Sequence, residues 1–236
     1  MSGIRTPQIR VRTAPEPVRS VRMSAAERAT TQMAVSLLLD YPDDAYGARL
    51  GVLRAEALRL PTPVRAALVE FLDGIEPLEV AERERRYVAT FDLKRKCCMY
   101  LSYYAAGDTR RRGAALVAFL EAYRAAGWEF DADELPDYLP AVLEFAARSG
   151  SPIADRLLAA HREGIEVLRA ALLAVGSPYA RLIEAVGMSL APIDDRTRER
   201  YLRLINEGPP AESVGLGPVE LPPFIPVGGA AAEVHR

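Results

Sequence analysis

The chain has 236 residues, of which half are hydrophobic and 26% are charged, a balance typical of a globular protein with a sizeable core and not of a disordered chain. Its formal net charge of −2 gives no overall electrostatic reason to bind nucleic acid or a membrane surface. No apolar run is long enough to span a bilayer, and the N-terminus lacks the apolar region of a signal peptide, so we expect a cytoplasmic protein without membrane insertion.

Residues 1–23 are predicted to form a disordered basic arm. They contain three prolines, five arginines against one glutamate, and no apolar periodicity. Such a composition cannot bury enough apolar surface to fold by itself. The arm could touch acidic partners, but a solvated tail is the favoured interpretation.

The first predicted helix begins with a capping box, in which Ser24 and Glu27 can each accept a hydrogen bond from the other's backbone N–H. Pro42 ends this helix, and Asp43 or Asp44 can cap the next. The following helices are expected to about Leu60, to about Leu72 after a Pro61-Thr-Pro63 break, from about Pro77 to Phe91, and from about Leu93 to Ala106.

Gly107 should stop the fifth helix, and Asp108 or Thr109 should cap the sixth, which ends at Gly127. Further helices are expected at about 137–148, 151–174, 178–187 and 195–206, and the carboxylate pair Asp194-Asp195 is interpreted as a helix cap. Six prolines follow Gly208, so residues 208–236 are predicted to be an extended tail. The predicted fold class is all-α, with a single compact domain of about nine or ten helices over 24–207.

Groups that could carry catalysis are scarce. The two histidines are His161, expected in mid-helix, and His235, next to the C-terminus. Cys97 and Cys98 are adjacent, which fits neither a C-x-x-C motif nor a disulfide framework, so we interpret them as buried thiols in a reducing compartment. We therefore predict a binding protein and no enzyme, with no catalytic residues and no metal site.

The segment from Glu82 to Gly113 is unusual in composition. It holds four of the chain's ten tyrosines together with Phe91 and two basic clusters. Tyr100 and Tyr104 are one turn apart on the predicted helix, so we expect them to share a face. Aromatic side chains with a polar tip suit a groove that is partly buried and partly wet. A core helix with a solvated basic edge explains the pattern equally well, and the residues alone leave both interpretations open.

This segment resembles the delta-subunit family of respiratory nitrate reductase, the NarJ group of assembly chaperones. The resemblance rests on the run Phe91-Asp-Leu-Lys-Arg-Lys-Cys-Cys98 and continues through Tyr100-Leu101, Tyr103-Tyr104 and Gly107 to Gly113. A second block, Glu134 to Phe145, is similar to a motif of the wider TorD-like chaperones of molybdoenzymes. Tyr138 stands there where many members have histidine, so a role that needs an imidazole is in doubt.

The resemblance implies an all-helical, cytoplasmic, non-catalytic chaperone. It would bind the N-terminal segment of the apo catalytic (alpha) subunit of nitrate reductase and keep that subunit competent for insertion of the molybdenum bis-guanine-dinucleotide cofactor and for complex assembly. It would hold no cofactor permanently, would bind no nucleic acid, and could meet cofactor-delivery proteins. Monomer and dimer both remain open.

An amphipathic client helix needs apolar contacts and a few polar anchors. We hypothesise that one groove is lined by Tyr87, Phe91, Tyr100, Leu101 and Tyr104. Candidate anchors for basic or N–H groups of the client are Asp92, Asp137 and Glu144.

The arginines Arg110, Arg111 and Arg112 lie at the start of the sixth predicted helix, where positive charge opposes the helix dipole. That placement suggests contact with an acidic client patch or with cofactor phosphates. A solvated or ion-paired face is the favoured alternative. For the whole protein, the alternative is a structural or regulatory subunit that stays bound to a redox complex; a nucleotide-directed helical enzyme would need acidic motifs that are not found.

Overall fold

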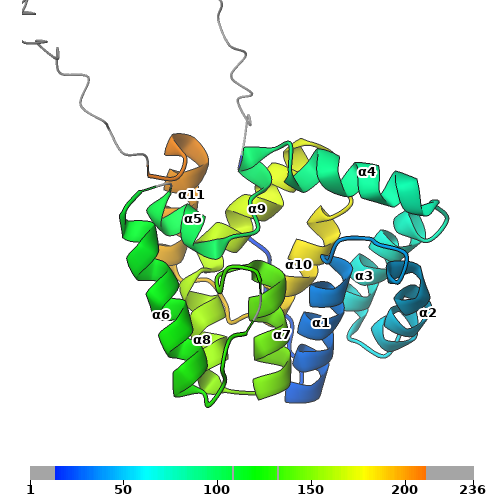
Figure 1. The fold of residues 1–236 in the computed structure, drawn as a ribbon, viewed down its shortest axis with the longest axis horizontal. Coiled ribbons are helices and arrows are strands. Elements are labelled where there is room, and N and C mark those ends of the chain that lie inside the picture. The colour runs from blue at the N-terminus through cyan, green and yellow to red at the C-terminus, as the bar shows by residue number, and fades with distance from the viewer. Residues whose placement is uncertain (1–13, 108, 132, 211–236) are drawn as a thin grey trace, which may run out of the picture.

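The computed structural model describes residues 14–210 except 108 and 132, and over these residues the chain is all-helical, which confirms the predicted fold class (Figure 1). The described part contains eleven α-helices and one 3-10 helix. These elements are α1 (Ala25–Leu38), α2 (Tyr46–Ala57), α3 (Thr62–Ile75), α4 (Val80–Phe91), η1 (Arg95–Cys97), α5 (Leu101–Ala106), α6 (Arg111–Ala125), α7 (Leu139–Ser149), α8 (Pro152–Ala160), α9 (Arg162–Ala174), α10 (Ala180–Ser189) and α11 (Asp195–Glu207).

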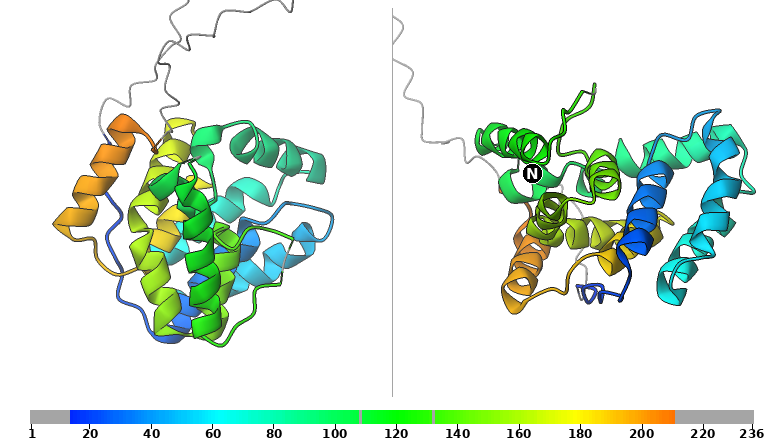
Figure 2. Two further views of the ribbon diagram at one scale, coloured as in Figure 1. Left: turned by 60° about the vertical axis from the view of Figure 1, so that its left-hand side comes forward. Right: turned by 90° about the horizontal axis from the view of Figure 1, so that it is seen from below.

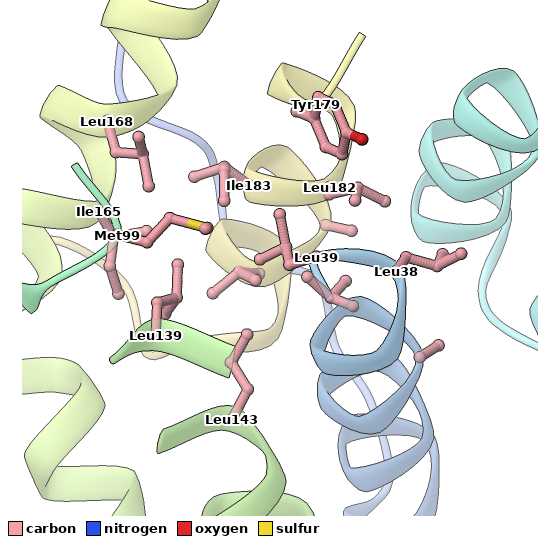
Figure 3. Packing of buried hydrophobic residues seen from close by; sticks show 14 of the residues in the cluster. Leu38, Leu39, Met99, Leu139, Leu143, Ile165, Leu168, Tyr179, Leu182 and Ile183 are labelled. Atoms are coloured by element: carbon pink, nitrogen blue, oxygen red, sulfur yellow. The ribbon is translucent and has the colours of Figure 1, made fainter. Parts of the chain in front are cut away.

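The core is built around five helices from different parts of the sequence. α1 packs along α7, and α10 packs against α1, α3 and α9. Figure 3 shows Leu39, Leu143 and Ile183 meeting between these helices, and all three side chains are fully buried. Burial of apolar side chains supplies most of the stabilisation, at about 1.5–3 kcal/mol for each.

The remaining helices flank this core on opposite sides (Figures 1 and 2). α2 and α3 pack against each other on one side, while α5, α6 and α8 lie on the other. α4 runs between the two sides and leads into η1. A cavity formed where α4 ends therefore receives side chains from segments far apart in the sequence.

Several helix ends agree with the sequence analysis. The capping box at Ser24 and Glu27 is present, and Asp194 caps α11 by accepting from the backbone N–H of Thr197. Gly107 ends α5 with φ +60°, a conformation that a residue with a Cβ rarely adopts. The predicted cap at Asp108 lies outside the described residues.

The prediction of one continuous helix from Leu93 to Ala106 is wrong. Residues 95–97 form a 3-10 turn, residues 98–100 are extended, and α5 begins only at Leu101. The backbone N–H of Leu101 donates to the carbonyl of Asp137, and the N–H of Leu139 donates to Met99. Tertiary backbone pairing thus replaces the helical hydrogen bonds of this stretch.

The predicted helix 151–174 is two helices, α8 and α9, which accounts for the larger helix count. The chain breaks at His161, with φ −108° and ψ 15°. The ring of His161 stacks on Phe119 of α6 at 4.7 Å between centroids, and its Nδ1 lies 2.9 Å from the carbonyl oxygen of Leu157. His161 therefore marks a bend and does not lie in mid-helix.

Residues 14–23 differ from the expected disordered arm. They are extended and lie against the domain, with the N–H of Val21 donating to the carbonyl of Met188. Buried arginines supply the hydrogen bonds that this short segment cannot make within itself. The rest of the predicted arm (1–13) and the tail from 211 lie outside the described residues. In the described part, no helix has the length and apolar character needed to cross a membrane.

Candidate binding cleft

The cleft is organised by a two-residue bridge between segments that are far apart in the sequence. Tyr100 and Tyr138 form an isolated antiparallel β-bridge, flanked by the hydrogen bonds from Leu101 to Asp137 (3.0 Å) and from Leu139 to Met99 (2.8 Å). The bridge places the two tyrosine rings 5.5 Å apart. It joins the two sequence blocks that carried the family resemblance.

α4 supplies the second wall of the cleft. Tyr87 and Phe91 lie one turn apart with ring centroids 4.9 Å apart. The hydroxyls of Tyr87 and Tyr138 are 3.2 Å apart, so one donates to the other. Burial raises the pKa of both tyrosines above the ordinary value, which keeps both hydroxyls protonated at neutral pH. Tyr41 extends this wall outward, with its ring edge-on to Tyr87 at 5.4 Å.

These walls enclose a cavity of about 300 Å³ that is open to the surface. Its lining combines aromatic rings and sulfur atoms with two acidic and two basic side chains. The lining residues are Tyr87, Phe91, Asp92, Arg95, Cys97, Cys98, Met99, Tyr100, Tyr103, Arg112, Glu134 and Tyr138. This mixture suits the insertion of an apolar side chain that has polar neighbours.

The charged groups of the cleft are not equivalent. Arg112 stacks over the ring of Tyr100 at 5.4 Å, and its Nε donates to the hydroxyl of Ser102. The hydroxyl of Tyr100 donates to Glu134 at 2.8 Å. The carboxylate of Asp92 is exposed and forms no hydrogen bond or ion pair with the residues that the structure describes. Asp92 is therefore the acidic group available to a ligand at the cavity mouth.

Asp137 supports the cleft from inside. Its side chain is fully buried, and Oδ2 accepts from both the backbone N–H (3.0 Å) and the hydroxyl of Ser102. Because the same hydroxyl accepts from Arg112, the carboxylate is linked through Ser102 to the arginine that lies on Tyr100. A ligand cannot reach Asp137 without displacing these groups.

Four of the eight residues expected to bind a client line the cavity, namely Tyr87, Phe91, Asp92 and Tyr100. The other four lie elsewhere. Leu101, Tyr104 and Asp137 are buried in the interior. Glu144 is exposed on α7 and pairs with Arg148 at 2.7 Å.

Tyr104 shows why the helical periodicity misled. It lies on α5, but its hydroxyl donates to the carbonyl of Cys98 (2.7 Å) in the interior. Its ring packs so closely on Gly164 of α9 that a Cβ there would lie 2.9 Å from it. Tyr104 fixes the extended chain at 98–100 and does not face the cavity.

The three arginines at 110–112 lie in different environments. Arg112 lines the cavity, whereas Arg110 and Arg111 are exposed at the start of α6. The sequence analysis missed Tyr138, Glu134 and Arg95 as lining residues. The block at 134–145 was the signal for the first two, since it contains both residues and includes the segment that pairs with Tyr100.

The thiols do not form a reactive pair. Neither Cys97 nor Cys98 forms a disulfide in the part of the chain that the structure describes, and burial raises the pKa of Cys97, which disfavours its thiolate. Among the residues that the structure describes, no group of three or more histidine, cysteine or carboxylate side chains could hold a metal ion.

Comparison with known proteins places these features in a family context. The family model described as nitrate reductase delta subunit matches residues 58–184. The Bacillus subtilis protein named "probable nitrate reductase molybdenum cofactor assembly chaperone NarJ" is 31% identical over 175 residues, which cover 74% of this chain and 95% of that protein. The NarJ chaperone of Escherichia coli K12 is 32% identical over 117 residues, 48% of this chain and 50% of its own length.

The nitrate reductase-like protein NarX of Mycobacterium tuberculosis H37Rv is 36% identical over 151 residues, or 64% of this chain. That match spans 23% of NarX, so the chain corresponds to about a quarter of the length of this relative. The matched stretch is therefore one portion of a longer protein in that organism.

Proposed function

The chain belongs to the nitrate reductase delta-subunit family, and from that premise we propose that it is an assembly chaperone for the catalytic subunit of respiratory nitrate reductase. It binds the N-terminal segment of the apo alpha subunit, keeps that subunit competent for molybdenum cofactor insertion, and leaves before the enzyme is complete. The Bacillus subtilis relative, which aligns over 95% of its length and carries such a name, is the observation that supports the role most directly.

The shape of the cleft supports a peptide client. An amphipathic helix can insert one apolar side chain between Tyr87, Phe91 and Tyr138, whose rings give a large contact area at low conformational cost. A basic side chain one turn away on the client can reach the exposed carboxylate of Asp92. The hydroxyl of Tyr138, which is only partly buried, supplies a further polar contact.

The molybdenum cofactor enters this proposal as the cargo of the client. The cleft residues hold the polypeptide, and none of them is required to hold the cofactor. Contact of Arg110 or Arg111 with cofactor phosphates or with an acidic client patch stays a separate prediction, since both lie outside the cavity. The proposal places the protein in the cytoplasm, without catalytic activity, and lets it meet cofactor-delivery proteins.

Isothermal titration with a synthetic peptide of the client's N-terminal segment tests the proposal. Replacing Tyr100 by alanine should weaken binding by about 2 kcal/mol, or roughly 30-fold, because it removes a central aromatic anchor. Asp92→Asn should weaken it while leaving the fold intact, since this carboxylate has no partner among the described residues. Glu144→Gln, on the exposed surface of α7, is the matched control and should bind as the wild type does.

Unchanged affinity in both cleft variants would contradict this assignment, as would an equal loss in the control. Binding of the same peptide with its basic residues replaced distinguishes the role of Asp92 from general loss of contact. If the basic residues contribute through Asp92, the double change should cost no more than either single change.

A permanently bound structural or regulatory subunit is the second candidate. In NarX of Mycobacterium tuberculosis the matched stretch belongs to a longer nitrate reductase-like protein, so a domain of this kind can be continuous with other segments. Purification of the mature reductase separates the two proposals. A stoichiometric complex that contains this chain favours the subunit, and its absence from active enzyme favours the chaperone.

A further inference from the structure

Residues 15–21, hereafter the strap, lie in extended conformation between α9, α10 and α11. Figure 2 shows this segment, in dark blue, running beside α11. The strap is bound through its backbone. The hydroxyl of Tyr201 donates to the carbonyl of Pro15 (2.7 Å), and the N–H of Val21 donates to Met188.

Three charged side chains of α9 form hydrogen bonds with the backbone at the centre of the strap. Glu166 accepts from the N–H of Val18 at 3.1 Å, and Arg162 donates to the carbonyl of Val18 at 2.7 Å. Arg169 donates to the carbonyl of Glu16. A carboxylate and two guanidinium groups thus satisfy successive peptide groups of an extended chain, as a neighbouring strand would do in a sheet.

This triad is organised by α9 itself. Arg162 and Glu166 are one turn apart, with 2.9 Å between a guanidinium nitrogen and Oε1 of the carboxylate. Nε of Arg169 lies 3.0 Å from Oε2 of the same carboxylate. Their side chains are only 3%, 1% and 9% exposed. Buried charges are costly unless their hydrogen bonds are met. We call this surface, together with Gly187 of α10 and Tyr201 of α11, the α9 slot; it is preorganised for a polypeptide backbone.

The slot also selects side chains. Val18 rests on Gly187, where a Cβ would come to 2.8 Å from the Cβ of Val18. Glu16 pairs with Arg198 at 2.7 Å. An acidic residue two positions before an aliphatic one therefore matches the slot, and the prolines at 15 and 17 hold such a chain extended before it binds.

We propose that the α9 slot is a second polypeptide-binding site, which accepts an extended acidic-x-aliphatic segment of a partner protein, and that the strap occupies it in cis until such a segment displaces it. Release of the strap exposes the triad to water, which offsets part of the lost hydrogen bonding. The strap is held by non-covalent contacts, so displacement leaves the helices in place. This site is separate from the tyrosine cleft and does not depend on the client proposed for it.

A second copy of the chain fits the slot less well than an independent polypeptide. Val21 is bonded to Met188, and the capping box of α1 begins at Ser24. Three residue steps span at most about 11 Å, so a strap donated by another copy would force the two α1 helices against each other. A free segment of a partner has no such restraint.

Fluorescence anisotropy with a labelled peptide of residues 14–22 tests the slot in the full-length chain. Val18→Asp replaces the apolar contact with Gly187 by a desolvated carboxylate, and should release the strap without altering the slot. This variant should bind the peptide at least tenfold more tightly than the wild type, about the factor expected when an intramolecular competitor is lost. Circular dichroism verifies that the helices are retained.

Gly187→Ala provides a matched control because alanine favours the helix while its methyl group occupies the place of Val18. When Gly187→Ala is combined with Val18→Asp, it should weaken binding of the peptide by about tenfold or more. A peptide with glycine at the position of Val18 should lose less affinity for Gly187→Ala than the unchanged peptide does, since no Cβ then opposes the new methyl group.

Absence of peptide binding by a folded Val18→Asp variant overturns the proposal. Equal loss of both peptides on Gly187→Ala overturns the assigned register. A concentration-dependent dimer of the wild-type chain that disappears with Gly187→Ala would assign the slot to a second copy and overturn the partner protein. Binding with the predicted register and a monomeric wild type supports the proposal.

Discussion

Replacement of Asp137 should lower the stability of the fold, whereas replacement of Asp92 should lower the affinity for the client, although the sequence suggested the same role for both. In Asp137→Ala, the backbone N–H and the hydroxyl of Ser102 lose their common acceptor in a fully buried place. Each hydrogen bond to a charged group contributes about 1.5–3 kcal/mol, and relief of the buried charge offsets part of the sum. We expect the free energy of unfolding to fall by about 2–4 kcal/mol.

Asp137→Asn keeps one oxygen acceptor for Ser102 and should lose about half as much as the alanine variant. Asp92→Ala, by contrast, removes an exposed carboxylate without a partner among the described residues, and should change the unfolding free energy by less than about 0.5 kcal/mol. Urea denaturation followed by circular dichroism measures both through the midpoint and the slope.

The result that would refute this reasoning is an Asp137→Ala variant with the midpoint and slope of the wild type. That result would mean that the carboxylate does not hold α5 in place. It would favour the interpretation of Asp137 as a client anchor. A loss of affinity with an unchanged urea midpoint, found for Asp92 and not for Asp137, is the expected pattern.

Three other changes give direct tests. Tyr87→Phe and Tyr138→Phe should each destabilise by about 0.5–1.5 kcal/mol, and the double variant should cost less than their sum, since the two hydroxyls share one hydrogen bond; a double-mutant cycle in urea measures this. Gly164→Ala should lower the melting temperature despite the better helix propensity of alanine, because its Cβ would overlap a buried tyrosine ring at 2.9 Å. Hydrogen bonds from Ser24 hold the pKa of Glu27 below its ordinary value. The stabilisation from this carboxylate is therefore complete above its ordinary pKa and lost as the pH falls through the lowered one, so Glu27→Gln should flatten the acid side of the stability profile.

The sequence predicted the features that depend on neighbouring residues. The capping box at Ser24, the stop at Gly107 and the cap at Asp194 act within one helical turn, and all three are present. Tyr87 and Phe91, which were assigned to the hypothesised groove, both line the cavity, because α4 is regular and places residues one turn apart on the same face. Local rules sufficed wherever the helix itself decides the direction of the side chains.

The same rules failed at the bridge between Tyr100 and Tyr138. The extended residues 98–100 are set by hydrogen bonds to a segment almost forty positions away, so the periodicity that put Tyr104 beside Tyr100 had no meaning there. The prediction for the strap was wrong for a related reason. Its arginines and prolines suggest a solvated tail, while the groups that bind it are buried on α9 and invisible in the local sequence.

The pairing of α1 with α7 bears on how the chain is made. α1 ends at Leu38 and α7 begins at Leu139, so roughly a hundred residues separate the two helices that pack most extensively. At a synthesis rate of about 5–20 residues per second, α1 waits some 5–20 s for its partner. During that time the face of α1 that α7 covers in the folded protein is exposed to solvent. The newly made chain is thus itself exposed to aggregation until its second half emerges from the ribosome.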